Sequence, residues 1–110
     1  PDDRNVISGN SNIGINIGGT GSTGNIIRGN YIGTDASGLL AVGSTGTGIN
    51  LYAGGNNNTF GGSSFGQGNV IIGSSGAGIA LSSVTGNSIT GNSIGVAADG
   101  STIIGNGGAG

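Results

Sequence analysis

The sequence predicts an all-β fold of the β-solenoid class, and three observations carry that prediction. Glycine supplies 29 of the 110 residues, while glutamate, lysine and methionine are absent. Because glycine costs about 1 kcal/mol per helix position relative to alanine, helices are disfavoured. The chain also repeats itself along its length. Within the repeats, apolar residues alternate in short stretches, which is the period of a strand with one buried face.

The long repeat comprises about 62–64 residues. Residues 5–9 match residues 69–73 at an offset of 64, and residues 24–48 match residues 86–110 at an offset of 62, with 12 identities in 25 positions. A shorter spacing of 18 to 23 residues separates the positions that open apolar stretches, which are Asn5, Asn25, Gly48, Asn69, Asn87 and Gly110. We therefore expect about five coils of about 18–23 residues, three to each long repeat.

The pattern runs through both ends of the chain. Residues 1–110 are therefore expected to form a single β-solenoid segment that is a window of a longer repeat array. Stacked coils bury a continuous column of side chains at each inward position. The alternation predicts these inward columns: Ile7, Ile27, Ile71 and Ile89; Ile32 and Ile94; Ile15, Ile49 and Ile79; and Ile17, Leu51 and Leu81.

Asparagine recurs at matching positions of the repeat. The positions are Asn5, Asn25, Asn69 and Asn87 at the openings, and Asn10, Asn30 and Asn92 after a glycine. Such amides can bind a ligand, or they can hydrogen-bond to one another between coils as a structural ladder. Since the positions follow the coil spacing, we expect the ladder.

The strings NVISGN, GINI, GNIIRGNYIGTDASG and NNNTFGG resemble the Gly/Asn-rich repeats of right-handed parallel β-helix proteins of bacterial surfaces, a pectate-lyase-like solenoid family. The resemblance covers nearly the whole chain. It implies right-handed coils, parallel strands and an extracellular or cell-surface location. Enzymes of this architecture use clusters of Asp, Lys and Arg, and this sequence has no such cluster.

Residue types that carry catalysis are scarce. The sequence has neither histidine nor cysteine, and its formal charges are confined to Asp2, Asp3, Arg4, Arg28, Asp35 and Asp99. A glycosidase needs two carboxylates across one bond. Asp35 and Asp99 occupy related loops, but these are expected about three coils apart, roughly 14 Å at strand spacing. We expect no catalytic residue and no enzyme activity.

No metal or cofactor site is expected either. The calcium-binding pattern G-G-x-G-x-D begins at Gly18 but has Thr23 in place of aspartate. Two arginines are too few to neutralise a nucleic-acid backbone, and no apolar run approaches the ~18 residues of a membrane span. The partners expected are a second copy stacked end to end, or the continuation of the same chain, and surface glycans.

Three function hypotheses remain open. The leading one is a non-enzymatic structural or adhesive segment of an extracellular surface protein or filament. The second is a carbohydrate-binding or carbohydrate-active β-helix whose site lies outside this window. Tyr31 and Tyr52 have no neighbouring aromatic residues, and we expect them to pack on the sheet surface instead of forming a sugar platform. The third is ice binding, which needs a Thr-x-Thr column on every coil, whereas only Thr45 and Thr47 have that spacing.

Overall fold

The computed structural model describes residues 4–42 and 46–108, and every regular element within these ranges is a β-strand. The strands are β1 (Val6–Ile7), β2 (Ile15–Gly18), β3 (Ile26–Ile27), β4 (Tyr31–Ile32), β5 (Ile49–Tyr52), β6 (Thr59–Gly61), β7 (Val70–Ile71), β8 (Ile79–Ser82), β9 (Ser88–Thr90) and β10 (Ser93–Ile94). The prediction of an all-β chain is confirmed for this part of the molecule.

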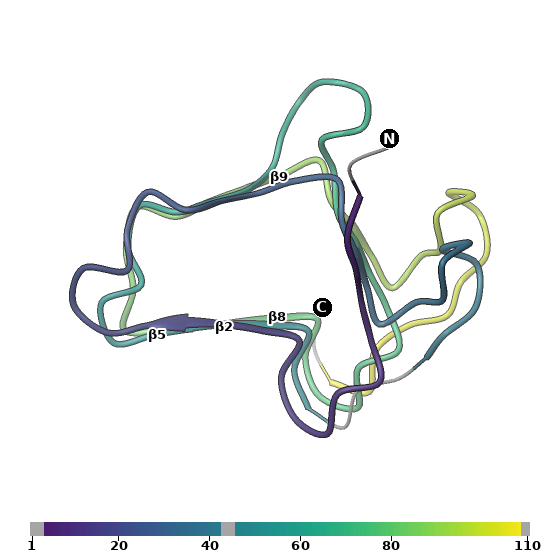
Figure 1. Cartoon of the computed structure of the whole chain (residues 1–110), viewed down its shortest axis with the longest axis horizontal. Helices are drawn as coiled ribbons and strands as arrows, with labels where there is room; N and C mark the ends of the chain where they lie inside the picture. Colours follow the sequence, from purple (N-terminus) through teal and green to yellow (C-terminus); the bar gives the residue numbers. More distant parts are fainter. Residues whose placement is uncertain (1–3, 43–45, 109–110) are drawn as a thin grey trace.

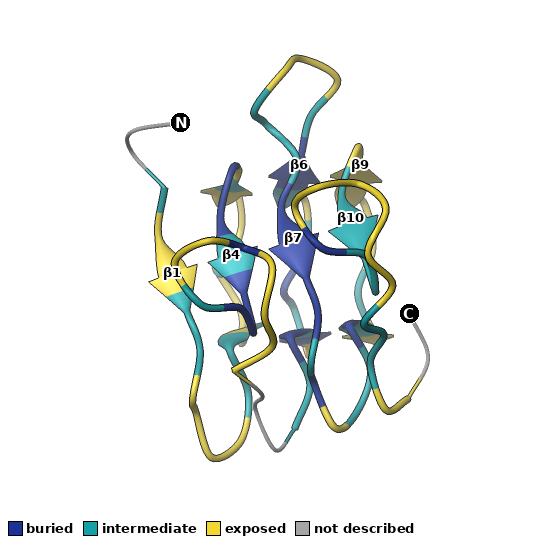
Figure 2. Cartoon of the chain, turned by 90° about the vertical axis from the view of Figure 1, so that its right-hand side faces the viewer, coloured by how far each residue is buried: buried dark blue, intermediate teal, exposed yellow. Residues whose placement is uncertain are grey.

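The strands form three sheets, and every strand pair in them is parallel. Sheet A has the order β1-β4-β7-β10, sheet B the order β2-β5-β8, and sheet C the order β3-β6-β9. The chain visits A, B and C in turn before it returns to A, and we call each such round a passage. Figure 1 shows the sheets as sides around a common interior, and Figure 2 shows β1, β4, β7 and β10 side by side. Sheet A thus contains one more strand than sheets B and C.

Glycine ends many of the strands because the backbone must turn sharply in little space. Gly33 follows β4 with φ +83°, and a Cβ there would lie 1.8 Å from the carbonyl oxygen of Ile72 in the next passage. L-residues rarely adopt that φ, and no side chain fits against a carbonyl at that distance. Strand β4 therefore ends at Ile32.

Most of the core lies in the second passage, and β7 of the third passage adds to it. Its fully buried members, each at most 1% exposed, are Ile32, Ile49, Leu51, Phe60 and Ile71. Inward residues of the first passage, such as Ile15, Ile17 and Ile27, are only partly buried. On the opposite side, Leu81 of β8 is 53% exposed. Both outer passages therefore leave apolar side chains accessible.

Two of the predicted columns are regrouped by the strand register. Ile7 pairs with Ile32, Ile32 with Ile71, and Ile71 with Ile94, so these four residues form one column in sheet A. Ile27 and Ile89 lie instead in sheet C, on either side of Phe60. The predicted column of Ile7, Ile27, Ile71 and Ile89 is therefore wrong. Ile32 and Ile94 share a column as predicted, but that column also contains Ile7 and Ile71.

The columns of sheet B are the ones that the residue spacing predicts. Ile15 lies beside Ile49 and Ile49 beside Ile79, while the second column is Ile17, Leu51 and Leu81.

The stacking period also differs from the expectation. Val6 pairs with Tyr31, Tyr31 with Val70, and Val70 with Ser93, so successive strands of sheet A are 23 to 39 residues apart. The sheets contain three or four strands, not five, and among the described strands only the spacing from β7 to β10, 23 residues, lies within the expected 18–23. The 64-residue offset joins β1 to β7 across β4. One long repeat therefore corresponds to two passages and not to three coils.

Three loops project from the body. Residues 34–41 and 96–103 each close with an antiparallel bridge, Thr34 to Ala41 and Val96 to Ile103. A third loop, residues 62–67, carries a fully exposed Phe65 at its tip and projects beyond β6 in Figure 2. Loops on a rigid scaffold commonly carry binding functions.

Candidate functional site

Asparagine amides form a continuous hydrogen-bonded row along sheet A. The row, which we call ladder A, comprises the residues that precede the four strands: Asn5, Asn30, Asn69 and Asn92. In Asn5, Asn30 and Asn69, the backbone N and the side-chain Nδ2 both donate to Oδ1 of the following asparagine, over 2.9 to 3.3 Å. Each amide therefore connects one passage to the next.

A second row, ladder C, runs before the strands of sheet C. The backbone N and Nδ2 of Asn25 donate to Asn58 Oδ1, and the backbone N of Asn58 donates to Asn87 Oδ1, each over 2.9 Å. Asn25 and Asn87 thus belong to a different row from Asn5 and Asn69, although the sequence repeat grouped them. Asn10 is exposed and takes part in neither row.

Asn58 is the residue that the sequence analysis missed. It is fully buried, and its Nδ2 donates to the carbonyl oxygen of Ser22. It stands third in the run Asn56-Asn57-Asn58, where the repeated residue type hides the register. The only signal was its position directly before Thr59-Phe60, which matches Asn25 before Ile26-Ile27.

The two ladders run in one direction and end in open hydrogen-bonding groups. Within the described ranges, nothing donates to Oδ1 of Asn5 or of Asn25, and both residues are exposed. On the other side, the Nδ2 of Asn92 donates only to the carbonyl oxygen of Phe60. Asn69 Nδ2 makes two bonds, to Ile27 O and to Asn92 Oδ1. Asn92 therefore retains one unused amide N–H.

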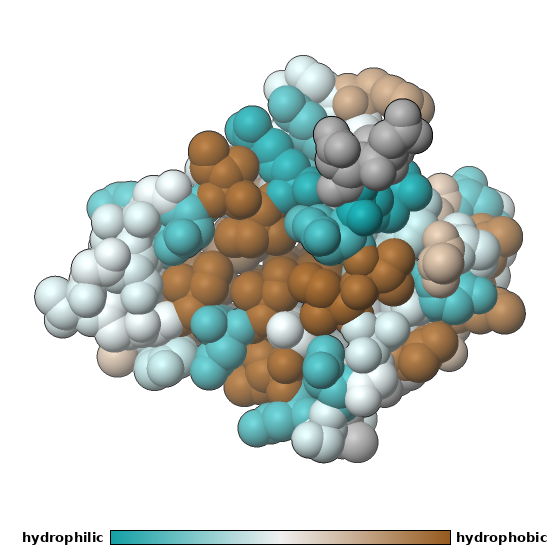
Figure 3. All heavy atoms as spheres, viewed as in Figure 1, coloured by the Kyte–Doolittle hydropathy of each residue, from teal (hydrophilic) through white to brown (hydrophobic). Residues whose placement is uncertain are grey.

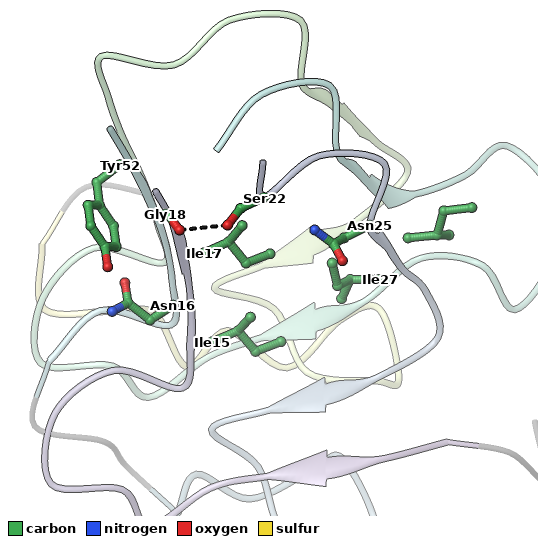
Figure 4. A pocket seen from close by; sticks show the side chains of 9 residues that line it. Ile15, Asn16, Ile17, Gly18, Ser22, Asn25, Ile27 and Tyr52 are labelled. Carbon is green, nitrogen blue, oxygen red and sulfur yellow. Dashed lines mark hydrogen bonds between the residues drawn. The ribbon is translucent and has the colours of Figure 1, made fainter. Parts of the chain in front are cut away.

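The side of the molecule bordered by β1, β2 and β3 is apolar and hollow. A depression of about 400 Å³ opens there, with the side chains of Ile15, Ile17 and Ile27 on its inner wall. Asn16, Asn25 and Ser22 contribute polar groups around it, and the Ser22 hydroxyl donates to Gly18 O (Figure 4). Figure 3 shows apolar atoms across the middle of this face. The arrangement suits another layer of apolar side chains and contains no reactive group.

The two predicted aspartate loops touch each other, contrary to the expected separation of three coils. The backbone N of Ala98 donates to Gly38 O. The loops meet because only a short turn follows β7, the strand between them. The carboxylates are nevertheless used inside their own loops: Asp35 accepts from Ser37, and Asp99 accepts from Ser101 and Thr102.

These local bonds shift the titration of both carboxyls. The Thr102 hydroxyl, followed by the Thr102 and Ser101 backbone N–H groups, lowers the pKa of Asp99 to about 2. The Ser37 hydroxyl lowers the pKa of Asp35. A general acid at neutral pH needs a raised pKa. Both aspartates therefore act as loop-forming anions in this structure.

The remaining polar candidates lie apart from one another. Arg28 is exposed, and its Nε donates to Gly61 O over 2.8 Å. The Arg4 guanidinium lies 4.0 Å above the Tyr31 ring. Tyr52 is 41% exposed and faces outward from β5 beside Gly18 and Asn16 (Figure 4). Thr45 lies outside the described residues.

No family model, no curated protein and no solved structure matches the chain. In the part of the chain that the structure describes, no set of three or more acidic side chains is placed to hold a metal ion. Nor does any helix in that part have the length and apolarity to cross a membrane.

Proposed function

We propose that this chain is a segment of a right-handed parallel β-helix that serves a structural or adhesive role without enzymatic activity in an extracellular or cell-surface protein. The parallel order of the three sheets supports the β-helix. Handedness follows from a general rule, because connections between parallel strands of one sheet are right-handed in about 98% of cases. The Gly/Asn-rich repeat supports the location.

The observation that carries the structural role is the pair of asparagine ladders. Asn30, Asn58 and Asn69 are buried, and their amides bond to neighbouring passages. A buried amide that is fully paired fixes one register, whereas an unpaired one is costly. The polar groups in the interior thus hold passages together and are not offered to a ligand.

An adhesive role would use the projecting loops. Phe65 is fully exposed at the tip of residues 62–67. This loop is internally braced, since Gln67 N donates to Ser64 O and Ser64 N donates to Gln67 Oε1. An aromatic side chain on a braced loop loses little conformational freedom when it binds.

The structural role is tested by limited proteolysis with proteinase K together with a polysaccharide turnover assay. We expect a protease-resistant body, with early cleavage confined to residues 34–42, 62–67 and 96–103, and no release of sugar products. Rapid cleavage inside β5 or β6 would contradict the structural role. Polysaccharide turnover that is abolished by Asp35→Asn or Asp99→Asn would establish an enzyme.

Carbohydrate binding is the second candidate, and one observation favours it. The exposed Tyr52 ring lies beside the amides of Asn16 and Asn50, which are joined by a hydrogen bond on the outer side of sheet B. Stacking on an aromatic face and bonding to amides is a common way to hold a sugar. Glycan-array binding that is lost in Tyr52→Ala and kept in Tyr31→Ala would support this candidate over the structural one.

A further inference from the structure

We propose that the β10 edge of one molecule binds the β1 edge of a second copy, extending sheet A and ladder A from molecule to molecule. The inference rests on the proposed β-helix and identifies its partner and its contact surface. The interface is head to tail, because β10 and β1 are different surfaces. Each molecule can therefore bind two copies, one through its β10 edge and one through its β1 edge.

The internal repeat already contains this interface. Asn92-Ser93-Ile94-Gly95 at β10 corresponds to Asn30-Tyr31-Ile32-Gly33 at β4, and Asn5-Val6-Ile7 at β1 corresponds to Asn69-Val70-Ile71 at β7. Strands β4 and β7 pair directly inside the molecule. The two edges therefore carry the equivalents of a strand pair that forms inside the molecule, with Ser93 in place of Tyr31. In the same register, Val6 of the second copy lies opposite Ser93 and Ile7 opposite Ile94.

The open hydrogen-bonding groups at the two edges are complementary. Inside the molecule, Asn30 donates two bonds to Asn69 Oδ1, and Val70 N donates to Asn30 O over 2.9 Å. At the junction, Asn92 has its backbone N–H and one amide N–H left to donate, and Asn5 Oδ1 is the open acceptor. The N–H of Val6 then donates to Asn92 O, completing the pattern.

The apolar side chains match as well. Ile7 and Ile94 are half-buried in the isolated molecule, whereas Ile32 and Ile71, which have neighbours on both sides, are at most 1% exposed. Pairing the edges places Ile7 against Ile94 in the same column. Because sheets B and C have one strand fewer than sheet A, the junction is continuous in sheet A alone. The association is therefore reversible and dependent on concentration.

A proline variant tests the β1 edge. The neighbouring strand uses the carbonyl groups of β1, since Tyr31 N donates to Asn5 O and Gly33 N donates to Ile7 O. Val6→Pro removes an N–H that these intramolecular bonds do not use, and proline is tolerated at such edges. In sedimentation over a concentration series, we expect the parent chain and the control Val6→Ala to associate. We expect Val6→Pro to remain monomeric with unchanged β circular dichroism.

Cysteine pairs test the register, because the chain has no cysteine of its own. Under mild oxidation, the Val6→Cys variant mixed with the Ser93→Cys variant should form a disulfide-linked dimer at least tenfold faster than Val6→Cys alone, or than Val6→Cys mixed with Ser88→Cys on the β9 edge. Directly paired positions lie within disulfide reach. The proposal would be overturned by a folded parent chain that stays monomeric. Equal rates of disulfide formation in the three cysteine samples would also overturn it. Polysaccharide turnover would instead overturn the proposed function.

Discussion

At the scale of single residues, the structure depends on a few positions that allow very little change. Buried asparagines and closely approached glycines allow neighbouring passages to lie at strand spacing. Asn69 takes part in ladder A on both sides, and Gly33 lies directly against a carbonyl of the next passage. Asn50 at the surface and Gly19 in open space are residues of the same types without these close contacts. They serve as matched controls for substitutions at Asn69 and Gly33.

Asn69→Ala is expected to lower the free energy of unfolding by at least about 2 kcal/mol, because it leaves the donors of Asn30 and the carbonyl of Ile27 without partners in the interior. The control is Asn50→Ala, whose amide donates to Asn16 at the surface. We expect that change to stay within about 0.5 kcal/mol. Urea unfolding followed by circular dichroism measures the free energy of unfolding of both variants. Equal losses of this free energy would show that burial of the ladder does not add to stability.

Gly33→Ala should destabilise the protein far more than Gly19→Ala. Both residues have positive φ, so both variants lose about 1–2 kcal/mol through backbone strain. At Gly33 the new Cβ would also collide with Ile72 O, whereas at Gly19 nothing lies within 4 Å. We expect the difference between their melting temperatures to exceed the effect of Gly19→Ala itself. Similar melting temperatures would mean that β4 and β7 are further apart than described.

At the scale of the strands and loops, core packing is concentrated in the second passage, β4 to β6. Phe60 of β6 is fully buried between Ile27 and Ile89, and Phe65, five residues later, is fully exposed. The same substitution can therefore be compared inside and outside the core. Phe60→Ala should cost about 3–5 kcal/mol, and Phe65→Ala less than about 0.5 kcal/mol. Differential scanning calorimetry would distinguish them, and a small loss at Phe60 would place β6 outside the core.

The loop of residues 96–103 makes a prediction about pH. The pKa of Asp99 is lowered to about 2 in the folded chain, so the stability that its loop bonds contribute is fully present above pH 3.8, the ordinary value, and is lost as the pH falls from there through about 2. Thr102→Val removes the largest cause and should raise the pKa of Asp99 toward 3.8. Carboxyl NMR titration measures it, with Asp35 as an internal control that must not move.

Sheet B could be predicted from the sequence, whereas sheets A and C could not be told apart. The four-residue strands of sheet B alternate clearly, as in Ile15-Asn16-Ile17 and Ile49-Asn50-Leu51. Strands β1 and β3 both read Asn, two apolar residues, one further residue and Gly, so their local patterns are the same. Only pairing partners many residues away separate them. Loops of unequal length between the strands then conceal the true stacking period.

The sequence predicts that asparagine amides stack between passages, but not which asparagines belong to which ladder. The recurrence of asparagine indicated stacked amides, but the division into two ladders depends on which strands share a sheet. Asn58 was hidden by its asparagine neighbours. The contact between the loops of Asp35 and Asp99 arises because β7 is followed by only a short turn, a difference in loop length that the sequence repeat did not indicate.

At the scale of the whole molecule, the backbone amides of the inner strands are better protected from hydrogen exchange than those of the outer strands. Strands β4, β5, β6 and β7 have paired neighbours on both sides, while the outer strands have one. We expect amide hydrogen exchange to be slowest in β5 and β6 and fastest in β1 to β3 and β8 to β10, because local opening follows the number of bonds and the amount of buried surface. Exchange that is uniform over all ten strands would contradict this. Slower exchange in β1 and β10 at high protein concentration would accompany the proposed association.

The uniform direction of the ladders also gives the molecule an electrical polarity. In both ladders, the Oδ1 of each asparagine after the first accepts from the asparagine of the preceding passage, so the carbonyl dipoles of these amides add along the stacking axis instead of cancelling. The β1 edge becomes the negative end and the β10 edge the positive end. Like edges repel and unlike edges attract before contact. A fibre assembled in this way has all its subunits facing one direction and two chemically different tips, and we expect those tips to elongate at different rates.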